Sequence, residues 1–144
     1  MNDNLKEAAR TVLINFMNDM NRWESWAYQL YQPENGGIEK NKEKAKEELE
    51  KIYSQYLTKK SRKTGRLAGP NVSSIPEYNI NEEQIERYDT SEKERVLVYT
   101  RKHDHNIKDY FEYFRYLIIY KNGQCLIDKK EILTYDEKWK NMVF

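Results

Sequence analysis

The residues that could do chemistry are few in this sequence and lie apart from one another. Asp128 follows the apolar pair Leu126-Ile127, a setting in which a carboxyl group can act as a general base. An ion-paired surface carboxylate is the commoner outcome for an acid that precedes two lysines. The tripeptide His103-Asp104-His105 has metal-ligand types, but no further ligand cluster lies nearby in sequence. We therefore predict no catalytic residue, no metal site and no cofactor.

Motifs for nucleophilic or nucleotide chemistry are also missing. The sequence contains no GxSxG, no P-loop and no dinucleotide fingerprint. Cys125 is the single cysteine, so it cannot form an intramolecular disulfide. On a predicted strand it is expected to pack as a small hydrophobic residue.

A basic run has the most functional potential. Five cations fall within eight residues: Lys59, Lys60, Arg62, Lys63 and Arg66. Such a run could bind phosphates or an acidic protein surface. The alternative is a structural role, for example that Arg62 and Arg66 fold back onto acids of the preceding helix.

Hydrophobic spacing predicts the elements that position these residues. Apolar residues recur every three or four positions from Leu5 to Leu30, which predicts an amphipathic helix. The turn Gln32–Gly37 ends it with a proline and two glycines. A second, more polar helix is predicted from Ile38 to Leu57. Residues 58–81 form a long loop, and loops of this length are often functional.

The last third of the chain predicts an antiparallel sheet. Arg95–Arg101 is a strand, and a weaker strand at 84–88 precedes it. Residues 110–121 are largely apolar on both faces, which predicts a central strand covered on each side. Asn122-Gly123 predicts a hairpin to a partner strand over 124–135. Two helices followed by these strands predict an α+β fold, with the helices packed on one face of the sheet.

Length and charge limit the class of protein. The chain has 144 residues, which predicts one domain over 1–144, and its 25 basic and 24 acidic residues nearly cancel. Aromatic residues reach 13 %, so we expect an ordered core built on tyrosine despite 34 % charged residues. Near-neutrality argues against general nucleic-acid binding. Without a membrane-spanning run or a signal sequence, we expect a soluble, cytoplasmic protein.

Four stretches carry a resemblance to a known family. They are Ile52–Lys60, Arg62–Arg66, Val96–Arg101, and Leu126–Glu131 with the tail Asp136–Trp139. In these the chain resembles the immunity proteins with a nuclear transport factor 2-like fold, which occur beside bacterial polymorphic toxins of the Rhs and WapA type. The similarity spans nearly the whole chain. Cys125 departs from it, because a large aromatic residue is expected there; we expect only local packing to change.

The resemblance implies a cone-shaped, nuclear transport factor 2-like (cystatin-like) fold, with N-terminal helices packed on a curved sheet. It also implies an immunity protein that binds and neutralises the C-terminal domain of a cognate toxin, without catalysis. A nuclease is one option for the toxin, and a homodimer stays open. The alternative is a small-molecule-binding domain or a lyase or isomerase that uses the cone's pocket.

Two observations would separate these functions. A buried acid paired with tyrosine or histidine at the pocket floor would favour an enzyme. A pocket filled by side chains such as Tyr53, Tyr99 and Tyr116 would favour a binding protein. A third option, nucleic-acid binding through residues 59–66, is the weakest because the net charge is only +1.

Aromatic residues crowd the end of the first helix. Trp23 lies on its core stripe, whereas Trp26 lies off it and either closes the mouth of the cone or is exposed. Because aromatic residues and arginines dominate interface hot spots, we predict a partner-binding surface. Its candidates are Trp26, Tyr31, Lys59, Lys60, Arg62, Lys63 and Arg66. We expect the acids Glu82, Glu83, Glu86, Asp89, Glu92 and Glu94 to be solvated surface, with contact to a basic toxin as the alternative.

Overall fold

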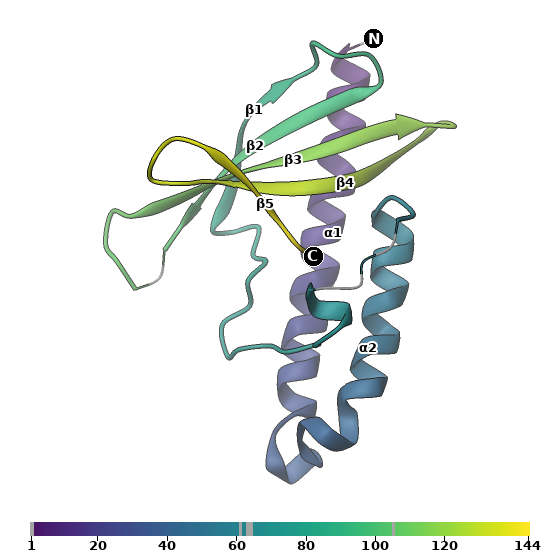
Figure 1. The fold of residues 1–144 in the computed structure, drawn as a ribbon, viewed down its shortest axis with the longest axis vertical. Helices are drawn as coiled ribbons and strands as arrows, with labels where there is room; N and C mark the ends of the chain where they lie inside the picture. Colours follow the sequence, from purple (N-terminus) through teal and green to yellow (C-terminus); the bar gives the residue numbers. More distant parts are fainter. Residues whose placement is uncertain (1, 61, 63–64, 105) are drawn as a thin grey trace.

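The computed structural model describes residues 2–60, 62, 65–104 and 106–144. Two long helices precede five strands, and two short 3₁₀ helices lie in the connections (Figure 1). The helices are α1 (Asn2–Leu30), η1 (Pro33–Asn35), α2 (Gly37–Tyr56) and η2 (Gly65–Leu67). The strands are β1 (Glu83–Asp89), β2 (Arg95–His103), β3 (Phe111–Lys121), β4 (Gln124–Leu133) and β5 (Trp139–Met142). Within the described part of the chain, no helix is long and apolar enough to cross a membrane.

The two helices form a hairpin, as the sequence predicts. The chain reverses at Gly36 and Gly37, whose φ angles of 109° and 78° are favourable only for glycine. Asn41 of α2 fixes the hairpin, because its side-chain amide donates to the carbonyl oxygens of Leu30, Asn35 and Gly37 at 2.8–3.0 Å. The end of α1 is thereby tied to the start of α2.

The strands form one antiparallel sheet in the order β1-β2-β3-β4-β5. The predicted hairpin between β3 and β4 is confirmed, since Asn122 and Gly123 have φ angles of 54° and 76°. Irregular pairing interrupts the β1–β2 ladder between Ile85 and Arg87, and the β3–β4 ladder beside Leu117. The short strand β5, which the sequence did not predict, extends the sheet through the pair Leu133–Trp139.

The core lies between the helices and one face of the sheet, and it relies on aromatic rings. Phe16 of α1 makes edge-to-face contacts with Tyr56, Tyr78 and Phe144, at ring-centroid distances of 5.3–5.9 Å. Such aromatic contacts stabilise a core beyond the burial of their area alone. Tyr116 is fully buried as well. The predicted tyrosine-based core and the α+β fold are therefore confirmed.

The prediction for β3 is half wrong. The strand is central, but the helices cover only one of its faces (Figure 1). No further helix or strand of the described chain covers the other face; long side chains that end in planar groups shield it. The Arg115 guanidinium stacks 4.5 Å from the Trp139 ring, and Tyr99 meets that ring at 5.7 Å. Leu117 is on this face as well, where it lines a shallow cleft with Leu97 and Arg115.

Candidate functional site

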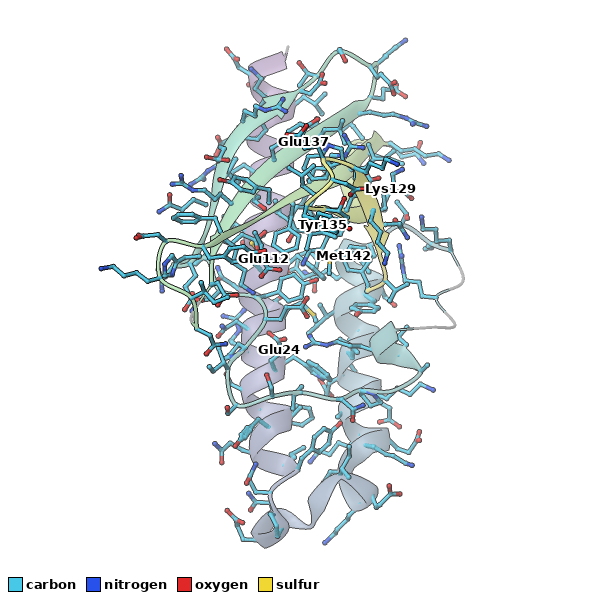
Figure 2. The ribbon with its side chains drawn as sticks, turned by 60° about the vertical axis from the view of Figure 1, so that its left-hand side comes forward. Glu24, Glu112, Lys129, Tyr135, Glu137 and Met142 are labelled. Atoms are coloured by element: carbon cyan, nitrogen blue, oxygen red, sulfur yellow. The ribbon has the colours of Figure 1, made fainter. Side chains whose placement is uncertain are left out.

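A buried ion pair ties the long loop to α1. Arg66 Nη2 lies 2.6 Å from Glu24 Oε1 and 3.4 Å from Glu77 Oε2. Glu24 comes from α1 (Figure 2), is 1 % exposed, and also accepts the backbone N–H groups of Glu77 and Tyr78. Arg66 therefore folds back onto acids as predicted, but these acids belong to α1 and to the loop. The prediction that its partners are acids of α2 is wrong, because η2 turns the side chain inward toward Glu24.

A buried lysine fills part of the interior. Lys130 is 2 % exposed, and its Nζ lies 4.4–5.4 Å from the ring centroids of Phe114, Tyr78 and Tyr116. Such contacts between a cation and ring faces are favourable when the cation is desolvated. Glu77 Oε1 lies 3.7 Å from the same nitrogen. The interior therefore holds the positive charge of Lys130, which the Glu77 carboxylate compensates and three aromatic rings surround.

Glu83 is also buried, so its predicted position on a solvated surface is wrong. It is 3 % exposed, and its Oε2 accepts hydrogen bonds of 2.7 Å from Tyr116 and Thr100. Burial raises the pKa of Tyr116 well above its usual value, with a further rise from Glu83. The acid–tyrosine pair is the arrangement that an enzyme would need. However, Tyr116 is 0 % and Thr100 1 % exposed, so a substrate has no path to this carboxylate in the structure.

The expected filling of the interior is only partly as predicted. Tyr53 and Tyr116 lie inside, and Tyr53 is 5 % exposed. The prediction that Tyr99 fills the interior is wrong, because this residue lies on the opposite face of the sheet. There it contacts Trp139 and the Arg87 guanidinium, which lies 3.5 Å from its ring centroid.

Asp128 behaves as an ion-paired carboxylate. It accepts a 2.7 Å hydrogen bond from Thr58 Oγ1, and Lys60 Nζ lies 3.3 Å away. Burial alone would raise the pKa of Asp128, but the Thr58 hydrogen bond and the Lys60 charge lower it. A depressed pKa suits a permanent anion rather than a general base at neutral pH. Of the metal-ligand types His103, Asp104 and His105, the last lies outside the described residues, and the described ones contain no cluster of three metal-ligating side chains.

A cleft between the helices surrounds Trp26. Its volume is about 450 Å³, and its apolar walls are Trp23, Trp26 and Ile52. Trp23 is fixed by a 2.8 Å hydrogen bond from its indole N–H to the carbonyl of Ala45. Trp26 is half-buried, with Lys44 Nζ 5.9 Å from its ring centroid. It is therefore held in place and still accessible.

Further clefts continue from Trp26 along α2. The second shares Lys51 and Gln55 with the first, and the third shares Glu50 and Ser54 with the second. The third is also lined by the basic residues Lys59, Lys60 and Arg62. We call this continuous surface the α2 band; it consists of Trp26, Glu47, Glu50, Lys51, Ile52, Ser54, Gln55, Lys59, Lys60 and Arg62. The structure thus brings Trp26 and three of the predicted cations onto one surface.

The other candidates lie elsewhere. The Tyr31 hydroxyl donates a 2.6 Å hydrogen bond to the Pro70 carbonyl in the loop. Tyr31 is five positions from Trp26, about 140° around α1, so the two rings lie on different sides of the helix. Arg66 is directed inward to Glu24. Lys63 lies outside the described residues.

The basic end of the α2 band is fixed by β4 and by Phe144. Thr58 N–H donates to the Ile127 carbonyl at 2.9 Å, just after α2 ends. Arg62 donates to the Thr58 carbonyl at 3.2 Å, and its guanidinium lies 5.3 Å from the Phe144 ring. Sequence reasoning missed Phe144, whose only signal is a large apolar residue two positions after β5.

The chain belongs to the NTF2 fold immunity protein family, since the model of that family matches residues 8–142. The class of function follows from the family: it is a toxin-neutralising immunity protein. Over 134 residues it is 36 % identical to Immunity protein RhsIA of Dickeya dadantii (strain 3937), covering 91 % of this chain and 92 % of that protein. No solved structure matches the chain. The predicted family and nuclear transport factor 2-like fold are therefore confirmed.

Proposed function

We propose that this chain neutralises its toxin by binding it one to one, without catalysis, in the cytoplasm of the producing cell. The observation that carries this proposal is the filled interior. Lys130 and three rings occupy the space beneath the sheet in which an enzyme of this fold would hold its substrate. With the interior filled, recognition falls to the surface.

We propose the α2 band as the surface that contacts the toxin's C-terminal domain. It combines an accessible tryptophan with lysine and arginine side chains, and aromatic residues and arginine are enriched at interface hot spots. Trp26 packs against the hydrophobic core and Arg62 contacts Thr58 and Phe144, so less side-chain entropy is lost on binding than for free side chains. A partner seated here would block the toxin's active site or distort it.

Co-expression with the cognate toxin domain, which is to be sought in the reading frame immediately upstream of this chain's gene, tests the proposal. The wild-type chain should restore growth, and the purified pair should form a one-to-one complex. Trp26→Ala should weaken the complex by about 100-fold, as expected for a hot spot. Tyr135→Ala is the matched control, since that ring is fully exposed outside the α2 band.

Two outcomes would contradict the proposal. Failure of the wild-type chain to bind or protect would remove the binding function. Unchanged affinity in both Trp26→Ala and Arg62→Glu, with melting temperatures near wild type, would remove the α2 band as the contact. Because Arg62 also contacts Phe144, Lys59→Glu supplies a second charge reversal at an exposed residue.

A further inference from the structure

We infer that the toxin surface facing the α2 band presents three groups in order: an apolar anchor, a cationic side chain and a carboxylate. This inference rests on the proposed function and specifies the chemistry of the partner. It follows from the way charge changes along the band.

The cleft beside Trp26 fits an apolar side chain. Trp23 and Ile52 line it, and the charges at its rim already have partners within their own helices. Arg22 pairs with Asp19 on α1, and Lys51 Nζ lies 2.9 Å from Glu48 Oε1 on α2. Because these ions are satisfied, a charged group would gain little here. Burying an apolar group in such a cleft is favourable.

The middle of the band is acidic. Glu47 and Glu50 are exposed and line the second cleft with Lys51. The hydrogen bond and charge of Glu48 raise the pKa of Lys51, which marks this lysine as already engaged. Lys51 pairs with Glu48 and is also attracted by the Glu47 charge, so a cation on the partner meets the remaining negative charge chiefly at Glu50.

The end of the band is basic. Lys59 and Lys60 are exposed, and Arg62 lines the same cleft. Asp128 lies 3.3 Å from Lys60 and offsets part of this charge, which leaves Lys59 and Arg62 to meet a carboxylate. Guanidinium and ammonium groups favour carboxylate partners.

The same order of charges disfavours a nucleic acid as the partner. A phosphate backbone is bound by a continuous track of cations. Here Glu47 and Glu50 lie directly beside the basic end, so a polyanion that follows the band would meet like charge. A protein surface of alternating charge fits the band better.

Charge reversal in the basic and acidic parts of the band tests this inference with the purified 144-residue chain and the cognate toxin domain. Lys59→Glu and Glu50→Lys should each raise Kd by about 10-fold, mainly by slowing association, and high salt should reduce the difference. The matched controls are Lys140→Glu and Glu7→Lys, which change exposed residues outside the band. Their Kd for the toxin should stay within about twofold of the wild-type value. A short DNA duplex should not compete with the toxin domain for binding to the chain.

The outcomes separate the two proposals. If the wild-type chain binds the toxin but neither reversal changes Kd by more than about twofold, the assigned partner chemistry is overturned and the binding function stands. Tight, steeply salt-dependent binding of the duplex would also overturn it, in favour of a nucleic acid. If the wild-type chain does not bind the toxin, the proposed function itself fails.

Discussion

Arg66 and Glu24 form an ion pair of 2.6 Å that joins the loop after α2 to the C-terminal part of α1. The loop thereby closes the interior from one side, while the Glu24 carboxylate also accepts the backbone N–H groups of Glu77 and Tyr78. One buried carboxylate thus satisfies a side chain and two backbone donors. The stability of the loop depends on it.

Glu24→Ala should therefore be strongly destabilising. It leaves two backbone N–H groups without their acceptor and leaves Arg66 with only the more distant Glu77 carboxylate, and breaking a buried ion pair costs about 3–5 kcal/mol. Urea unfolding measures this loss. Glu7→Ala removes an exposed pair with Arg10 and should stay within about 0.5 kcal/mol of wild type. Equal effects of the two substitutions would contradict the role given to Glu24.

Gly65→Ala should cost more stability than Gly123→Ala. Both glycines have a positive φ, 80° and 76°, so each alanine bears the left-handed strain of about 1–2 kcal/mol. At Gly65 the added Cβ would also lie 2.0 Å from the Phe144 carbonyl oxygen, whereas at Gly123 it would meet nothing within 4 Å. Urea unfolding of the two variants measures the difference. Equal losses would show that Phe144 does not pack against this turn.

Stability should fall in acid through Glu77. Burial alone would raise the pKa of Glu77, but the charges of Lys130, Arg66 and Lys102 lower it below the ordinary 4.5. The stabilisation is complete above pH 4.5 and is lost as the pH falls through the lower folded value. The melting temperature of Glu77→Gln should therefore decline less than that of wild type between about pH 6 and pH 3. The exposed control Glu7→Gln should decline as wild type does, and a Glu77→Gln curve parallel to it would refute the assignment.

Tyr31→Phe should lower stability and leave toxin affinity unchanged. The substitution removes the hydroxyl that donates to the Pro70 carbonyl, a hydrogen bond worth about 0.5–1.5 kcal/mol. Thermal unfolding and a binding titration measure the two effects separately. Weaker binding at unchanged stability would place Tyr31 in the toxin contact, as the sequence alone predicted.

Much of the fold could be predicted because its signals are local. The repeat from Leu5 to Leu30 and the glycine turn after it define α1, and Asn122-Gly123 defines the β3–β4 hairpin. Strand β5 gave no such signal. It has four residues, and its pairing with β4 follows from a turn whose Glu137 adopts a positive φ of 62°. The Trp26 position off the core stripe predicted either the mouth of the cone or exposure, whereas the residue is half-buried in a cleft between the helices.

The interior could not be predicted, because a bulge changes which side chains point inward. Cys125 and Ile127 of β4 are buried, so strict alternation would direct Lys129 to the core. The register shift beside Leu117 adds a residue, and Lys130 becomes the buried one. Glu83 was missed for a related reason: only its partners Thr100 and Tyr116, on other strands, make its burial favourable.

The two outer strands have a consequence for the amount of protein that a cell can hold. A flat, free strand edge invites pairing with another chain, whereas a bulged or very short edge resists it. In this sheet β1 is interrupted between Ile85 and Arg87, and β5 spans only Trp139–Met142. If the chain binds its toxin one to one, as we propose, it must accumulate to at least the level of that toxin. These blunted edges allow that accumulation without chains adding to one another's sheets.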